Sequence, residues 1–211
     1  MDVGESEQIR YSATVERLPE QPSRILHVGC ARHDEERRSQ ANLHDYLLEF
    51  LEDTCSGECE LIGIDILEEE ITLMQSEGYN VQRMDAEDLE FDEPFDAIVT
   101  GEVIEHLANP GKFLVEATEN LASDGRLVLT TPNPDGFAYF RKALLSQPNN
   151  PTHTCWIDPG NLRRLVQVSS ADLTLVESQL LPPTGGVSMA LWRLGRRRAA
   201  SPHWVATLER S

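Results

Sequence analysis

The chain has 211 residues, about 40% of them hydrophobic, which fits one domain around a single core. Its 36 acidic and 18 basic residues give a formal net charge of −18, a balance that disfavours nucleic acid and anionic membranes as general partners. No apolar run approaches the roughly 20 residues of a membrane helix, and the acidic start, MDVGESEQIR, lacks a signal-peptide pattern. We therefore expect a soluble, cytoplasmic protein.

The make-up of the charge is unusual, because Lys112 and Lys142 are the only lysines. Excess carboxylate with little lysine is typical of adaptation to high salt, in which case the overall charge says little about the partner. The four cysteines are scattered, and the one close pair, Cys55 and Cys59, has no second pair beside it. We expect reduced, structural thiols.

Strand and helix patterns alternate along most of the chain. Compact β-rich runs predict strands at residues 24–30, 60–66, 80–84, 95–100 and 125–132. Helical spacing of apolar residues predicts helices at residues 43–51, around 71–74, at 113–121 and after Asp158-Pro159. The alternation indicates an α/β fold, doubly wound, with a mostly parallel seven-stranded sheet.

The end of the chain breaks the alternation. Residues 171–181 and 187–194 are predicted as two last strands that form a C-terminal antiparallel hairpin around the PPTGG sequence. The predicted organisation is an N-terminal arm at residues 1–21, one domain at 22–195 and a C-terminal tail at 196–211.

Polar residues follow three of the predicted strands where each strand ends. In a doubly wound fold, ligands bind beyond the carboxyl ends of the strands. Gly29 allows a close approach of backbone to a ligand, Asp65 can accept hydrogen bonds from two ribose hydroxyls, and Asp85 can accept from an exocyclic amine. Together these positions indicate an adenosine pocket.

The ordered series ILHVGC, LIGIDI, MDAEDL, FDAIVTGEVIEHL and GRLVLTTPNP resembles the class I S-adenosylmethionine-dependent methyltransferases, from about residue 24 to residue 180. The resemblance implies S-adenosylmethionine as cofactor. It places Gly29 and Cys30 at the methionine part, Asp65 at the ribose, and Asp85 and Ala86 at the adenine edge. The full implied set is Gly29, Cys30, Asp65, Ile66, Asp85, Ala86, Thr100, Gly101 and Glu102.

Two alternatives to methyl transfer stay open at this point: a nicotinamide-dependent oxidoreductase and a non-catalytic adenosine-binding regulator. Dinucleotide binding uses several glycines to bring backbone against a pyrophosphate. Here Ala31 and His33 occupy the places of the family's later glycines. S-adenosylmethionine has no phosphate, so a single glycine favours the methyltransferase.

Two glutamates and a histidine lie together after the fourth predicted strand. On a helix that begins near Gly101, Glu102, Glu105 and His106 would share one face and point into the mouth of the pocket. Three interpretations remain. The glutamates support a helix N-terminus and His106 is a packed histidine; His106 or His153 is a general base; or the cluster binds a divalent metal.

The metal interpretation comes from a closer resemblance. The pattern E-x-x-E-H, followed after TPN by a further histidine, is similar to the ubiquinone-pathway O-methyltransferases and the small-RNA 2′-O-methyltransferases. This resemblance implies that Glu102, Glu105, His106 and His153 hold magnesium, manganese or zinc.

The acceptor is expected to be a hydroxyl on a small molecule, a lipid-linked compound or a glycan precursor, with an RNA terminus as the second choice. Segments that cover the pocket would select it, among them residues 132–156. The aromatic residues Phe137, Tyr139 and Phe140 could stack on a substrate or be buried by an amphipathic helix. Residues 196–198, three arginines, could contact a phosphate or an anionic headgroup, or form a solvated tail. The oligomeric state is not predicted.

Overall fold

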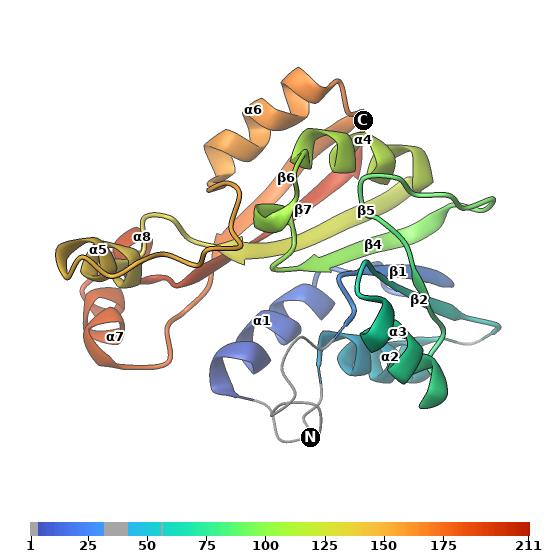
Figure 1. The fold of residues 1–211 in the computed structure, drawn as a ribbon, viewed down its shortest axis with the longest axis horizontal. Coiled ribbons are helices and arrows are strands. Elements are labelled where there is room, and N and C mark those ends of the chain that lie inside the picture. Colours follow the sequence, from blue (N-terminus) through green and yellow to red (C-terminus); the bar gives the residue numbers. More distant parts are fainter. Residues whose placement is uncertain (1–3, 32–41, 56) are drawn as a thin grey trace.

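Seven strands form one sheet, covered by helices on both faces (Figure 1). The computed structural model describes residues 4–31, 42–55 and 57–211. The strand order is β3-β2-β1-β4-β5-β7-β6, and β7 is antiparallel to both of its neighbours while the other paired strands are parallel. The strands are β1 (Arg24–Val28), β2 (Glu60–Asp65), β3 (Val81–Arg83), β4 (Phe95–Gly101), β5 (Leu121–Pro132), β6 (Leu173–Leu180) and β7 (His203–Arg210). The predicted fold class is confirmed.

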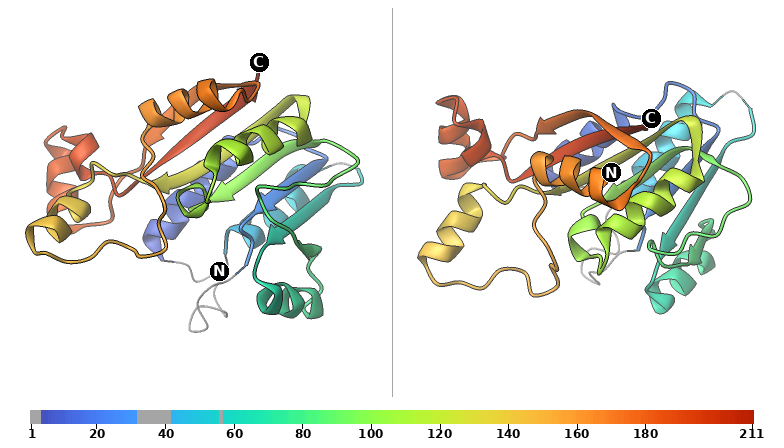
Figure 2. Two further views of the ribbon diagram at one scale, coloured as in Figure 1. Left: turned by 45° about the horizontal axis from the view of Figure 1, so that its top comes forward. Right: turned by 90° about the horizontal axis from the view of Figure 1, so that it is seen from above.

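Helices α1 and α2 lie on one face of the sheet, and α4 and α6 lie on the other (Figures 1 and 2). No helix within the described ranges is long and apolar enough to cross a bilayer. The helices are α1 (Glu5–Val15), α2 (Leu43–Thr54), α3 (Glu68–Ser76), the 3₁₀-helix η2 (Ile104–His106), α4 (Pro110–Asn120), α5 (Phe137–Leu144), α6 (Pro159–Ser169), α7 (Gly186–Arg193) and α8 (Arg197–Ala200).

A core lies on each side of the sheet. Phe113 of α4 and Leu162 of α6 are fully buried in the larger cluster, against strand residues such as Ile98. Ala13 of α1 and Leu47 of α2 belong to a second cluster on the opposite face. Because both faces of the strands are covered, the strands read as nearly continuous apolar runs, which is why their positions could be predicted.

The C-terminal segment differs most from its prediction. Residues 203–210 form β7, which lies between β5 and β6, and Trp204, Val205 and Ala206 are fully buried. Residues 187–194, predicted as a strand, lie in α7, so the antiparallel partner of β6 is β7. The tail assignment for residues 196–211 is wrong because the arginines and Pro202 precede a strand whose apolar side chains complete the core on both faces.

The predicted N-terminal arm also contributes to the core. Helix α1 packs against β5 and β7. Arg17, just after α1, is buried and forms an ion pair with Glu177 of β6 at 2.7 Å. The cysteines depart from expectation as well, because Cys55 and Cys59 form a disulfide, while Cys30 and Cys155 are free thiols.

Candidate active site

Gly29 lies directly after β1, where the chain turns at the carboxyl end of the sheet. Its φ of 77° is in the left-handed region that glycine adopts readily. A Cβ at this position would lie 2.2 Å from Cγ2 of Val103. The backbone N–H groups of Gly29 and Cys30 both donate to the carbonyl of Ile64, at 2.8 and 3.1 Å. The glycine is therefore required by the turn and by the close packing beside it.

Asp65 ends β2, next to Gly29, and its side chain is 6% exposed. Its carboxylate accepts hydrogen bonds from the backbone N–H groups of Ala31, at 3.2 Å, and Leu67, at 3.1 Å. The next side chain, Ile66, is 61% exposed although it is apolar. A fixed carboxylate beside an uncovered apolar side chain fits the ribose and the flat ring of an adenosine.

The other predicted cofactor residues differ in their surroundings. Asp85 is exposed and accepts a hydrogen bond from the backbone N–H of Glu87, whereas Ala86 is buried. Thr100 is buried at the end of β4, and its hydroxyl has no hydrogen-bond partner among the described residues. The Cys30 thiol packs in a small core cluster with Ile71, Met74 and Val81, and burial raises its pKa to about 12. This placement gives Cys30 a packing role.

Glu102 does not lie on a shared helix face with Glu105 and His106, as predicted. The helix begins later and is only η2, while Glu102 has a φ of 60°, which is uncommon for a residue with a side chain. Its backbone N–H donates to the carbonyl of Thr130 on the neighbouring strand. The end of β4 therefore stays in the sheet at Glu102, and the chain turns sharply before η2 can form.

The Glu102 carboxylate lies between two basic groups. Its oxygens are 3.7 Å from Nη1 of Arg10, on α1, and 3.3 Å from Nε2 of His203, on β7. Burial lowers the pKa of His203, and the Glu102 carboxylate opposes this shift. Glu102 is thus held by groups from two distant parts of the chain.

Glu105 carries the most perturbed carboxyl group of the site. It is 1% exposed, one oxygen accepts a hydrogen bond from the Thr131 hydroxyl at 2.9 Å, and the other has no partner among the described residues. Burial, and then the nearby Glu102 carboxylate, raise the pKa of Glu105 to about 8. A buried carboxylate oxygen without a donor is costly unless a proton or a cation occupies its free side.

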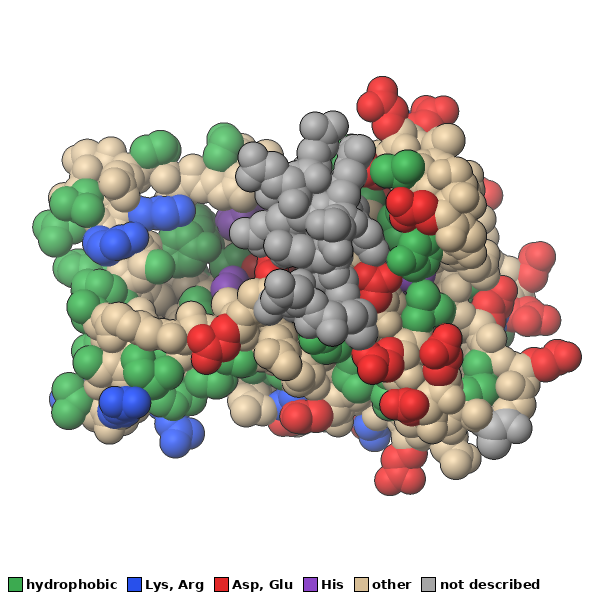
Figure 3. Space-filling view, turned by 90° about the horizontal axis from the view of Figure 1, so that it is seen from below, with side chains coloured by type: hydrophobic (Ala, Val, Ile, Leu, Met, Phe, Trp, Pro, Cys, Tyr) green, Lys and Arg blue, Asp and Glu red, His purple; other side chains and the backbone are tan. Residues whose placement is uncertain are grey.

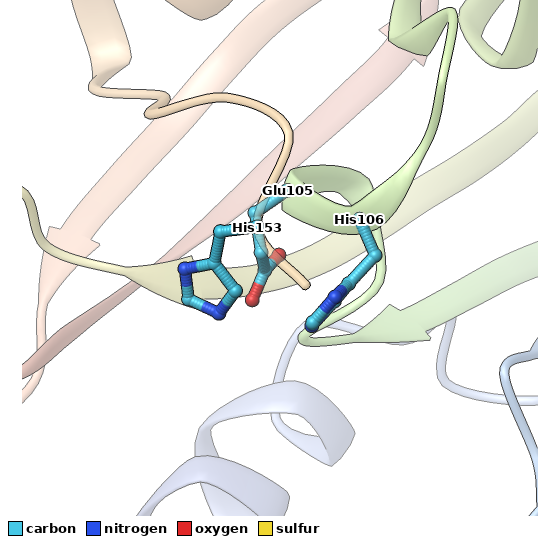
Figure 4. Close-up of side chains that lie close together, drawn as sticks. All are labelled: Glu105, His106 and His153. Atoms are coloured by element: carbon cyan, nitrogen blue, oxygen red, sulfur yellow. The ribbon is translucent and has the colours of Figure 1, made fainter. Parts of the chain in front are cut away.

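His106 and His153 lie next to this carboxyl group, with their ring centroids 4.8 Å apart (Figure 4). The Nδ1 of His106 is 3.1 Å from the backbone carbonyl of Thr152, so Nδ1 is the donor in this contact and Nε2 is the nitrogen left for another partner. Burial and the charge of His106 lower the pKa of His153, so its ring is neutral at pH 7. A neutral imidazole is the form of histidine that binds metals.

Glu105, His106 and His153 fit a divalent cation. One ligand atom from each residue lies within 4.8 Å of the others. Two ligands of the same ion are usually about 3 to 4 Å apart, given metal–ligand distances near 2.1 Å, so small rotations of the side chains suffice. Glu102, the fourth predicted ligand, does not belong to this group, because it is engaged with Arg10 and His203.

Two residues of the site, Arg10 and His203, were not predicted, and Tyr139 was considered only for stacking on a substrate or burial in an amphipathic helix. Arg10 and His203 lie in the segments interpreted as arm and tail, and only the position of α1 and β7 in the fold brings them to Glu102. Burial, followed by the charges of Glu102 and Glu105, raises the pKa of Tyr139 to about 12. Its ring contacts Trp156, which contacts His153. The aromatic content of residues 132–156 was the one signal for this wall.

Two histidines outside this site form a buried pair, with Nδ1 of His27 3.2 Å from Nδ1 of His44. Burial, and then His44, hold the pKa of His27 well below its ordinary value, so its ring is neutral. No role was predicted for either residue from the sequence. His33, which stands where the family has a glycine, lies outside the described residues.

A family model for a methyltransferase domain matches residues 5–178 of the chain. No curated protein matches the sequence significantly. Solved structures share the fold at low identity. The putative methyltransferase of Haloferax volcanii, in complex with the Trm112 methyltransferase activator, has a TM-score of 0.66 and 15% identity, over 97% of this chain and 90% of that one.

Two bacterial structures are similar to the chain over nearly their whole length. The N-methyltransferase NodS from Bradyrhizobium japonicum WM9 has a TM-score of 0.62 and 18% identity, over 100% of this chain and 99% of that one. A second NodS structure contains S-adenosyl-L-homocysteine. An S-adenosylmethionine-dependent methyltransferase from Mesorhizobium loti has a TM-score of 0.65 and 16% identity, over 98% and 99%.

The family model spans most of the chain, and Gly29 and Asp65 lie at the carboxyl ends of the paired strands β1 and β2. The chain therefore belongs to the methyltransferase domain family and is an S-adenosylmethionine-dependent methyltransferase.

Proposed function

We propose that the protein transfers the methyl group of S-adenosylmethionine to a hydroxyl of a small-molecule, lipid-linked or glycan acceptor, and that Glu105, His106 and His153 hold a divalent cation for this step. The single observation that carries the proposal is the buried Glu105 oxygen without a hydrogen-bond donor among the described residues, beside the imidazoles of His106 and His153. Mixed carboxylate and imidazole ligands suit magnesium, manganese or zinc.

Methyl transfer from a sulfonium needs little from the protein beyond alignment, but a hydroxyl acceptor must lose its proton. A divalent cation lowers the pKa of an oxygen that contacts it, which allows that loss near neutral pH. Glu105 supports such an ion by ionising, which releases the proton that its raised pKa retains at pH 7. An amine loses its proton far more readily than an alcohol and attacks as the neutral base without a metal, so a cation at this site favours a hydroxyl acceptor.

The remaining groups set the position of the reactants. Asp65 would fix the ribose through hydrogen bonds, Asp85 and Ala86 would line the adenine edge, and the turn at Gly101 and Glu102 would lie close to the sulfonium. Arg10 and His203 hold the Glu102 carboxylate in this turn. His153 would take the proton of the acceptor in the absence of an ion, since its ring is neutral.

The decisive experiment measures methyl transfer to hydroxyl acceptors after chelation and after each metal is added back, for the wild type, Glu105→Gln and His106→Ala. We expect chelation and both substitutions to abolish turnover while affinity for S-adenosylmethionine stays within a few fold. Calorimetric titration with magnesium, manganese and zinc measures the binding of the ion independently of turnover. Glu119→Gln, an exposed carboxylate on α4, is the matched control.

Full activity in excess chelator would refute the metal. In that case His153 remains as general base, and the rate should fall only below about pH 6.5, the ordinary value for histidine, because burial lowers the pKa of His153. Activity toward amines alone, with none toward hydroxyls, would overturn the hydroxyl acceptor while leaving methyl transfer in place.

A further inference from the structure

The basic residues are concentrated at one end of an acidic molecule. Residues 136–157 and 178–208 contain no Asp or Glu, and they contain six of the chain's 18 Lys and Arg residues. The other 12 bases share the rest of the chain with all 36 acids. In the structure these two segments supply α5, α7 and α8, which lie at the same end of the molecule, beyond the carboxyl end of β5 (Figures 1 and 2). We call these three helices, with Leu145 and Leu194 at their ends, the basic lobe.

The basic lobe also exposes large apolar side chains. Of the eight exposed large hydrophobic residues in the described part of the chain, five lie in it: Phe140, Leu144, Leu145, Val187 and Leu194, each 56% to 76% exposed. Phe140 and Leu144 are four residues apart and so share one face of α5; Val187 and Leu194 are seven apart along α7. Clustering of this kind marks a surface that contacts an apolar partner.

The lobe's positive charges are largely available to a partner. Arg198 forms an ion pair with Asp135 at 2.6 Å. Within the described ranges, Arg141, Lys142, Arg193 and Arg196 form no ion pair. Figure 3 shows that blue and green side chains gather at the left end of the molecule, while red side chains dominate the right. The net negative charge of the chain therefore does not describe this end.

The lobe adjoins the active site. Tyr139 of α5 contacts Trp156, and Trp156 contacts His153, with ring centroids 4.5 and 5.4 Å apart. The lobe is also tied to the loop after β5, where the Asn133 side chain donates to the carbonyls of Arg198 and Ser201. In Figure 3, histidine side chains (purple) lie in a hollow beside the region where the green and blue side chains gather.

We propose that the basic lobe docks on an anionic lipid bilayer and brings the active site to its surface. Short helices that combine exposed Leu, Phe and Val with Arg and Lys are suited to the boundary between headgroups and acyl chains, with guanidinium groups on the phosphates. An acidic body directed away from the bilayer would orient the molecule. This inference rests on the proposed function where it concerns the acceptor. Of the three acceptor classes, a protein docked on a bilayer favours the lipid-linked hydroxyl.

The test is co-sedimentation of the full chain with vesicles of phosphatidylcholine alone and of equal parts phosphatidylcholine and phosphatidylglycerol, without cofactor or metal. We expect binding to the anionic vesicles only. The double variant Leu144→Glu with Leu194→Glu, and the double variant Arg141→Glu with Arg196→Glu, should each weaken it about tenfold or more. Val168→Glu and Arg163→Glu, at exposed positions of α6 outside the lobe, are the matched controls and should bind as the wild type does.

Salt separates the two contributions. At molar salt the Debye length falls to about 3 Å, so binding of the wild type should fall to that of the arginine variants, whereas at low salt the leucine variants show the apolar contribution with all charges of the lobe in place. A melting curve for each protein at each salt concentration shows that it is folded. Absence of binding by a folded wild type, equal binding to both vesicles, or leucine variants that bind like Val168→Glu would each overturn the proposal.

Two further measurements discriminate the occupant and the acceptor. Self-association of the chain without vesicles, abolished by the leucine variants, would assign the lobe to a second copy and overturn the lipid surface. Transfer of labelled methyl groups from S-adenosylmethionine into a native lipid extract, reduced in the lobe variants and normal in the α6 controls, would support the lipid-linked acceptor. Vesicle binding is measured without turnover. Full activity in excess chelator would therefore refute the metal and leave the vesicle result unchanged, and absence of vesicle binding would leave the metal proposal unchanged.

Discussion

Gly29 and Gly195 allow the backbone and packing costs of a side chain to be separated within one molecule. Their φ angles are nearly equal, at 77° and 75°. A Cβ on Gly195 would meet no atom within 4 Å, whereas a Cβ on Gly29 would lie 2.2 Å from Cγ2 of Val103. The left-handed conformation costs an alanine about 1 to 2 kcal/mol. Overpacking adds about 1 to 3 kcal/mol at Gly29 alone.

We therefore expect Gly195→Ala to lower the free energy of unfolding by about 1 to 2 kcal/mol and Gly29→Ala by about 2 to 5 kcal/mol. Denaturant titration at fixed salt measures both. Adding Val103→Ala to Gly29→Ala should recover part of the difference, since the two changes are in contact and their effects are not additive. Equal destabilisation by the two glycine variants, or no recovery with Val103→Ala, would refute the assignment of a steric role to Gly29.

Asp65→Ala should weaken binding of S-adenosylmethionine and its demethylated product by about 1 to 3 kcal/mol, measured by calorimetry, through loss of hydrogen bonds to the ribose; unchanged affinity would contradict the ribose contact. Molar potassium chloride should raise the melting temperature, because it screens repulsion between surface carboxylates; a flat or falling curve would contradict the high-salt interpretation. Because the folded pKa of Glu105 is raised to about 8, the folded protein holds a proton between about pH 4.5 and 8 that the unfolded chain has lost. The contribution of this group to stability therefore falls as pH rises through that window. In the presence of chelator, the melting temperature of Glu105→Gln should rise relative to that of the wild type between pH 5 and pH 8. A constant difference between the two melting temperatures would contradict the raised pKa.

The sheet could be predicted because its parallel strands are buried on both faces and therefore read as apolar runs that end in polar residues. Asp65 shows the rule: the strand ends where its carboxylate can accept backbone N–H groups from the following turn. The same signal failed for β7. This strand lies inside the sheet, between β5 and the edge strand β6, but a run of arginines precedes it in the sequence. Local composition does not reveal that β5 and β6 leave a gap that only a later strand can fill.

Helix α7 shows the opposite error. Residues 187–194 carry Val, Met, Leu and Trp at a density that suggests a buried strand, yet Val187 and Leu194 are exposed. A high density of apolar residues indicates burial only where an element faces the core. The sequence of this segment does not show that α7 lies away from the core. On the proposed contact with a lipid surface, the apolar character of residues 187–194 serves binding, and the error was to assign that character to the protein core.

Three of the four predicted metal ligands, Glu105, His106 and His153, lie together, but the predicted geometry around Glu102 is wrong. Sequence spacing placed Glu102, Glu105 and His106 on one helix face, which assumes that helical geometry begins at the end of the strand. Glu102 instead remains paired with β5 and has a positive φ, a conformation held by the surrounding structure because it is unfavourable by itself. The turn directs its carboxylate to Arg10 and His203. The two glutamates, equivalent in sequence, therefore differ: Glu102 contacts Arg10 of α1 and His203 of β7, and Glu105 is buried with one oxygen unpartnered among the described residues, beside two imidazoles. Contacts from both ends of the chain thus distinguish the two glutamates as candidate ligands of a cation. The local sequence of residues 102–106 does not show these contacts.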